Sequence, residues 1–211
     1  MTDSTYLDEL FIQESKAALD YHNKSSGDTC KEDFAGLIDG TATEITVPEG
    51  CAKIKSYAFY LAASLVLVSL PDSITSIGQH AFDNCTNLAL TSLPDNITSI
   101  DEYAFRGCTN LALTSLPSGI TAISNHVFAY CTNLALTSLP SGTTSIGQQA
   151  FDHCTNLTTI TFNSTPTSIG SIVFYQCDNL TTINVPWAEG EVANAPWGAI
   201  NATINYNYTG G

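Results

Sequence analysis

Apolar side chains recur every 23 residues between residues 44 and 186. Phenylalanine recurs at Phe59, Phe82, Phe105, Phe128, Phe151 and Phe174. Cysteine recurs at Cys85, Cys108, Cys131, Cys154 and Cys177. Isoleucine and leucine form two more columns, at Ile54, Ile77, Ile100, Ile123, Ile146 and Ile169 and at Leu65, Leu88, Leu111, Leu134, Leu157 and Leu180. Independent columns that share one period over six copies predict a solenoid of stacked coils.

Each coil contains three pieces whose patterns predict local structure. Residues 97–100, Ile-Thr-Ser-Ile, are typical of a short strand. In residues 104–108, Phe105 and Cys108 are three positions apart and would share a face, which predicts a helical or 3₁₀ turn. Residues 111–116 predict a second strand, ended by Pro117, which lacks the N–H to continue a ladder. One coil alone buries too little apolar surface to offset the entropy of ordering it, so the coils must stack.

The segment Ser-Ile-Gly-x-x-Ala-Phe-x-x-Cys-Thr-Asn-Leu, at residues 76–88 with near copies at 145–157 and 168–180, resembles the BspA-like class of leucine-rich repeats. The resemblance covers about residues 44–186. It implies a leucine-rich-repeat solenoid, a right-handed coil with a parallel sheet on one face and short helical or 3₁₀ turns. It also implies a secreted or cell-surface protein that binds other proteins.

The middle coils depart from the Leu-x-x-Ile-x-Leu pattern of this class. Residues 157–162 follow it, whereas residues 88–93 read Leu-Ala-Leu-Thr-Ser-Leu. Strict strand alternation would point Thr91 inward and Leu90 outward. The resulting candidate for partner binding is an apolar stripe with a serine rim, Leu67, Leu90, Leu113 and Leu136 with Ser69, Ser92, Ser115 and Ser138. The alternative is that the strand bulges and the leucines turn inward, because threonines in the core and leucines outside are a costly arrangement.

Both ends of the repeat need caps, because a solenoid otherwise exposes apolar end faces. Residues 1–40 predict a helical N-terminal cap, with a short oligomerising helix as the alternative. Residues 41–186 hold the six coils, and residues 187–211 predict a C-terminal cap. There, Trp187 and Trp197 would seal the last coil or, alternatively, stack on a ligand. The closing strand is predicted from the alternation of Ile200, Ala202, Ile204, Tyr206 and Tyr208.

Charge and composition exclude several classes of partner. Only 12% of the residues are charged and the formal net charge is −14, so a nucleic-acid backbone would be repelled. No apolar run approaches the roughly 18 residues of a membrane-spanning helix, so membrane insertion is not expected. Residues 1–9 have neither the basic nor the apolar region of a signal peptide.

The reactive residue types do not assemble a catalytic, cofactor or metal site. The cysteine column predicts a ladder of buried, reduced thiols, whereas Cys30 and Cys51 lie outside it and could pair. No Cys-x-x-Cys pair is present for zinc. His80 and His126 share a column with Tyr103 and Gln149, which predicts an exposed position. The asparagine column predicts turn residues that tolerate left-handed geometry and whose amides bond along the stack, at Asn87, Asn110, Asn133, Asn156 and Asn179.

Two functions follow as hypotheses. The first is a non-catalytic interaction or adhesion module without a cofactor, which presents its sheet face to a protein or glycan at a cell surface. The second is a structural or receptor-binding component of a phage or prophage particle, in keeping with the missing signal peptide. The oligomeric state does not follow from the sequence.

Overall fold

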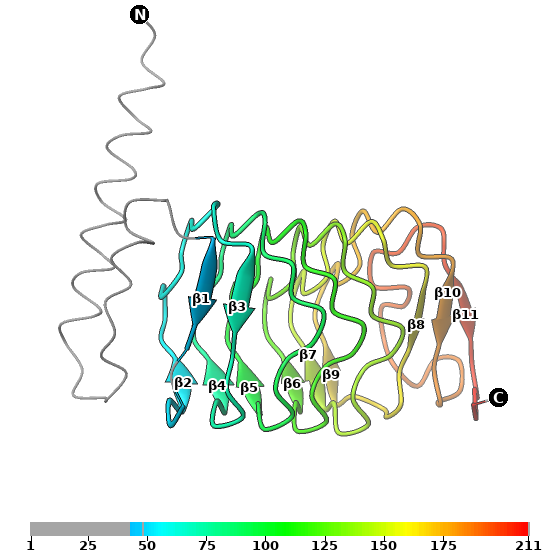
Figure 1. The fold of residues 1–211 in the computed structure, drawn as a ribbon. Coiled ribbons are helices and arrows are strands. Elements are labelled where there is room, and N and C mark those ends of the chain that lie inside the picture. The colour runs from blue at the N-terminus through cyan, green and yellow to red at the C-terminus, as the bar shows by residue number, and fades with distance from the viewer. Residues whose placement is uncertain (1–42, 48, 211) are drawn as a thin grey trace, which may run out of the picture.

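The 23-residue period closes into one coil of a solenoid, and equivalent residues of successive coils lie beside one another (Figure 1). The structure is a computed structural model that describes residues 43–47 and 49–210. Its strands within that range are short, and all their pairings are parallel: β1 (Glu44–Thr46), β2 (Lys53–Ile54), β3 (Leu67–Ser69), β4 (Ser76–Ile77), β5 (Ser99–Ile100), β6 (Ala122–Ile123), β7 (Ser145–Ile146), β8 (Thr159–Thr161), β9 (Ser168–Ile169), β10 (Thr182–Asn184) and β11 (Thr203–Asn205).

The strands form two rows along the solenoid (Figure 1). The first row contains two three-stranded sheets, β2-β4-β5 and β6-β7-β9, built from the repeated isoleucine and the residue before it, which is serine in four of the six strands. Ile77 pairs with Ile100 in the next coil, and both are buried while the flanking residues face outward. The second row contains β1-β3 and β8-β10-β11, and the three coils between them carry no strand there. The predicted parallel sheet and repeat solenoid are thus confirmed.

The Ala-Phe-x-x-Cys segments form successive turns that do not continue as a helix. The predicted bond between positions three apart is present, since the Cys85 N–H donates to the Phe82 carbonyl over 3.0 Å. The Phe82 N–H, however, donates to Ala104 of the next coil over 2.8 Å, as it could not in a helix. Two residues per coil also have left-handed backbone angles, such as His80 (φ 55°) and Asn84 (φ 59°). A right-handed helix cannot pass through such residues, so the turns are used to join coils instead.

The phenylalanine column forms a continuous stack at the centre of the core. Phe59 and Phe82 have ring centroids 4.9 Å apart and nearly parallel rings, and the same stacking continues through Phe105, Phe128, Phe151 and Phe174. All six side chains are almost completely buried. Each coil therefore supplies one ring of a shared core, which is why stability depends on neighbouring coils.

The five cysteines of the repeat column are free and buried, as predicted. Each thiol donates to the carbonyl oxygen of the phenylalanine one coil earlier, as Cys108 does to Phe82 over 3.0 Å. Burial raises the pKa of the Cys177 thiol to about 12. The column therefore combines apolar packing with a hydrogen bond between coils. Cys51 is disulfide-bonded, and Cys30 lies outside the described residues, so their pairing stays a prediction.

Exposed polar columns also bond along the stack. The Asn87 amide donates to the Ala63 carbonyl over 2.8 Å, and the Asn179 amide to the Thr155 carbonyl over 2.7 Å. The predicted amide bonds along the stack are present for Asn87, Asn110, Asn156 and Asn179, but the backbones of this column are not left-handed. The turn geometry places the left-handed angles three residues earlier instead, at positions such as Asn84 and Gly107.

The C-terminal end is sealed by aromatic side chains. Trp187 and Trp197 are 3% and 2% exposed, and both pack against Phe162, so neither can stack on a ligand from solvent. Strand β11 pairs with β10, but its Ile204 is only half-buried and Ile200 is exposed, so the predicted apolar face of this strand is only partly covered. The predicted N-terminal helical cap, residues 1–40, lies outside the described residues. Within the described ranges no helix is long and apolar enough to cross a bilayer.

Candidate functional site

The inward-facing position of the second row differs between the middle coils and the coils on either side of them. In β8 the fourth residue of the Leu-x-x-Ile pattern, Ile160, is fully buried. In the middle coils the third residue is buried instead: Leu113 is 0% exposed, whereas Thr114 is exposed. The apolar residue thus reaches the core although it occupies a different position, because the backbone moves by one residue. A one-residue shift in a strand exchanges the buried and exposed faces.

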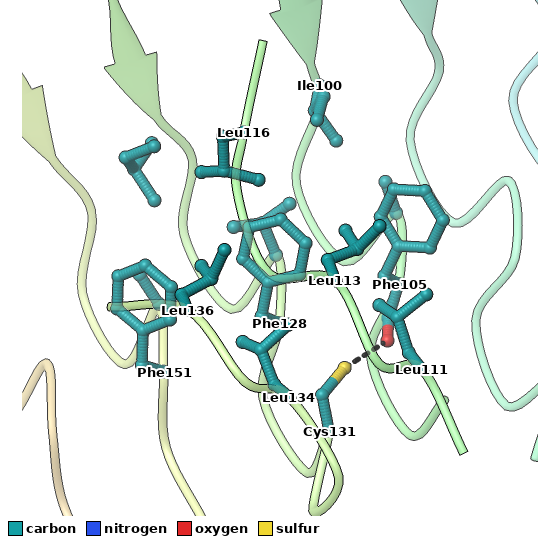
Figure 2. Packing of buried hydrophobic residues seen from close by; sticks show 14 of the residues in the cluster. Ile100, Phe105, Leu111, Leu113, Leu116, Phe128, Cys131, Leu134, Leu136 and Phe151 are labelled. Carbon is teal, nitrogen blue, oxygen red and sulfur yellow. Dashed lines mark hydrogen bonds between the residues drawn. The ribbon is translucent and has the colours of Figure 1, made fainter. Parts of the chain in front are cut away.

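The candidate leucine stripe is therefore only partly a surface. Leu113 and Leu136 are buried, and Figure 2 shows both pointing among the rings of the phenylalanine column. The expectation that they face a partner is wrong, and the alternative of inward-turned leucines is correct for these two coils. Leu90 is partly buried against the core, and only Leu67 is exposed, at 48%. Of the serine rim, Ser69, Ser92 and Ser115 are exposed and Ser138 is half-buried.

The shift also interrupts strand pairing. β3 pairs with β1 and has no strand on its other edge. In the following coil, the N–H groups of Thr91, Ser92 and Leu93 have no hydrogen-bond partner among the residues that the structure describes. Regular pairing returns only near β8, where Ser138 forms an isolated bridge with Thr161. Three coils therefore present an irregular backbone on the face where the flanking coils present a sheet.

A groove of about 550 Å³ opens where the pairing stops. It is lined by Leu67, Val68, Leu70 and Asp72 of one coil and by residues 89–95 of the next. Leu67 and Leu90 supply exposed apolar surface, whereas Val68 and Leu93 are buried beneath them. The groove follows the strand direction, because its lining residues extend along both coils, from 67 to 72 and from 89 to 95. The leucines and serines here were predicted from the sequence, but the groove was not, because it exists only where adjacent coils have different inward-facing positions.

The groove is acidic at one end. Asp72 and Asp95 occupy the same position in adjacent coils, and both are exposed. The equivalent residues of the next two coils are Ser118 and Ser141, so among these four coils the carboxylates occur only here.

A second polar region lies on the turns. His80 hydrogen-bonds the buried Asp83 over 2.7 Å, and His153 hydrogen-bonds the buried Asp152 over 2.5 Å. Burial raises the pKa of the Asp83 carboxyl above its ordinary value, an effect that the His80 hydrogen bond opposes. His80, predicted to be exposed, is half-buried, and so are the other members of its column, Tyr103, His126 and Gln149.

The rings of this column cover one another. Tyr57, His80, Tyr103 and His126 stack with neighbouring centroids 4.7–4.8 Å apart, so the faces between them are not open to a sugar ring. Burial lowers the pKa of His126. In the described part of the chain no group of three or more histidine, cysteine and acidic side chains is arranged to hold a metal ion. The rings of the turn region thus stack between coils.

Comparisons with known proteins agree with this architecture. Residues 34–141 and 121–194 match the profile of the BspA type leucine rich repeat region, in six copies. A leucine rich cell surface protein from Faecalibacterium prausnitzii is 34% identical, with a TM-score of 0.62, over 68% of this chain and 38% of that one. The leucine rich repeat protein of T. pallidum is 32% identical, with a TM-score of 0.51, over 65% of this chain and 78% of that one.

No curated protein matches the chain. The chain spans less than two thirds of the length of the Faecalibacterium protein, at 38%. The profile match nevertheless covers most of the sequence and includes all the phenylalanine, cysteine and leucine columns of the repeat. The chain belongs to the BspA type leucine rich repeat family.

Proposed function

We propose that this chain is a non-catalytic interaction module that binds a macromolecule at a cell surface through its second row of strands. Solenoids provide long, continuous faces, and their proteins commonly use such faces for binding. The observation that carries the proposal is the groove beside β3, a hollow with exposed apolar and polar groups on a face that is otherwise covered by Thr and Ser.

The comparisons support the cell-surface part of the proposal. The Faecalibacterium relative is a leucine rich cell surface protein, and it shares the repeat architecture of this chain. The disulfide at Cys51 fits the same setting, because disulfides persist mainly in oxidising compartments. The buried thiol column does not conflict with it, since those thiols are shielded from solvent.

The experiment is a binding screen with the purified full chain. Matrix proteins, glycans and bacterial cell walls are immobilised, and binding is measured for the parent and for Leu67→Lys, which changes an exposed side chain at the groove. Leu61→Lys serves as a matched control, because Leu61 is a half-buried leucine on the turns. Circular dichroism melts verify that both variants remain folded.

Saturable binding that Leu67→Lys weakens and Leu61→Lys leaves unchanged supports an interaction module acting through this face. Saturable binding that neither variant changes moves the site to another face. Absence of binding to any surface, together with self-assembly in light scattering, would contradict the proposal and favour a structural component of a larger particle.

A further inference from the structure

The groove beside β3 combines apolar side chains, unpaired backbone amides and a negatively charged end. We propose that it binds an extended, basic segment of a partner protein. An aliphatic side chain of that segment lies over Leu67 and Leu90, and a lysine or arginine lies between Asp72 and Asp95. This inference rests on the proposed interaction function and names the class of partner.

The backbone favours an extended peptide. Leu67 and Ser69 bond toward β1, since the Leu67 N–H donates to Thr43 and the Ser69 carbonyl accepts from Val47. Residues of a strand alternate the side to which their N–H and C=O groups point, so Val68 directs its groups toward the groove. On the opposite wall the Ala89 N–H donates back to the Val66 carbonyl over 2.9 Å, so the same alternation directs the Thr91 N–H into the groove; this N–H has no hydrogen-bond partner among the described residues. The two coils remain hydrogen-bonded beside the groove, from Ala89 to Val66 and from Thr98 to Thr75, so an extended segment would lie across these unpaired backbone groups and not between two separated strands.

The apolar lining favours a protein over a glycan. All the large apolar residues of the groove are aliphatic, and no aromatic ring lines it. Glycan sites usually need an open aromatic face, whereas aliphatic surface favours an aliphatic side chain such as valine or leucine. Leu67 is 48% exposed and Leu90 is partly exposed, so both lose water-accessible surface when a side chain covers them.

The negative charge of the groove favours a partner segment with positive charge. Asp72 and Asp95 are both exposed at the same end, and the chain as a whole carries a net charge of −14. A second copy of the chain would therefore be repelled. Residues 1–42 contain nine acidic and three basic residues, a net charge of −6, so this segment of the same chain also has the wrong sign. Complementary charge gives both faster association and selectivity, which a basic segment supplies.

The test is selection from a phage-displayed library of random dodecapeptides on the full chain. The most enriched peptide is then synthesised with fluorescein and titrated by fluorescence polarisation. We expect enriched sequences to contain an aliphatic residue and a lysine or arginine. We expect the double variant Asp72→Asn/Asp95→Asn to lose about ten-fold or more in affinity. Leu67→Lys should lose a similar amount, because it blocks the apolar part of the groove with a like charge.

The matched control is Asp101→Asn/Asp178→Asn, which removes two exposed carboxylates that do not line the groove. Equal weakening by both pairs of substitutions would show general charge attraction and overturn the proposal. The absence of enrichment over the Asp72→Asn/Asp95→Asn protein would overturn it as well. If a surface ligand is nevertheless captured equally by parent and Asp72→Asn/Asp95→Asn, the interaction function stands and only this groove is excluded.

Discussion

The thiol of Cys131 donates a hydrogen bond to the carbonyl oxygen of Phe105, 3.0 Å away on the preceding coil (Figure 2). The same oxygen accepts the N–H of Cys108 over 3.1 Å, which closes the turn within its own coil. One carbonyl therefore serves both the local turn and the stacking of coils. A residue at this position must be small, apolar and able to donate, which explains why cysteine recurs there.

Replacing this donor should weaken the stack. We expect Cys131→Ala to lower the free energy of unfolding by about 1–3 kcal/mol, because it removes a buried hydrogen bond and leaves a small void. Urea unfolding followed by circular dichroism measures the change. Thr132→Ala is the matched control, since the Thr132 hydroxyl also bonds the preceding coil but is exposed. Equal losses in the two variants would contradict the role given to the buried thiol.

The thiol column makes stability fall in alkaline solution. Burial raises the pKa of Cys177 from 9.0 to about 12, so between these values the unfolded chain loses the proton and the folded chain keeps it. The unfolded state then binds fewer protons, so the free energy of unfolding decreases as the pH rises above 9 and is unaffected by this group below it. Chemical unfolding between pH 8 and pH 11 measures the slope. Cys177→Ala should show a smaller slope, and an unchanged slope would refute the assignment.

Leu113 and Leu67 occupy equivalent positions, but replacing them with alanine should lower the free energy of unfolding by different amounts. Leu113→Ala should reduce the free energy of unfolding by about 2–5 kcal/mol, because a fully buried leucine leaves a cavity. Leu67→Ala should cost less than about 1 kcal/mol, because that side chain is 48% exposed. Thermal or urea melts of the two variants give the comparison directly. Similar costs would mean that the two coils share one inward-facing position after all.

The buried position of this coil should move from residue 113 to residue 114 when the apolar side chain is moved there. Leu113→Thr alone should cost about 2–4 kcal/mol, and adding Thr114→Ile should restore at least half of that loss. The double variant reads Leu-Ala-Thr-Ile-Ser-Leu at residues 111–116, which matches the pattern of β8. Amide hydrogen exchange should then show stronger protection at residues 113–115, since a regular strand would pair. Additive costs without added protection would count against the shifted backbone.

Much of the fold was predictable because the repeat is a property of the sequence. The period predicted that Phe82, Cys85, Leu88 and their equivalents in the other coils face inward, and these three side chains are buried. The Ser-Ile strands and the sealing of the last coil by Trp187 and Trp197 were also predicted. Each repeat column rests on one residue type at one spacing, so local pattern and burial point to the same answer.

The turns and the candidate site were less predictable. Left-handed angles occur at positions as different as His80, Ile172 and Gly107, so residue type gives no signal for them. The groove depends on a comparison between coils: Leu67 and Leu90 line it, whereas Leu113 at the same position is buried. The sequence shows its carboxylates, Asp72 and Asp95, but does not show that they line a common groove.

The sequence by itself determined the period, the residues of the core and the row of Ser-Ile strands, because a residue repeated in every coil has the same neighbours in every coil. Only the tertiary structure decided which way Leu90, Leu113 and Leu136 point and where the second row of strands is interrupted. Strand alternation predicts a face only while the backbone stays regular. In the middle coils, burial of a leucine outweighs the strand hydrogen bonds that water can replace, so the backbone shifts and the leucine enters the core.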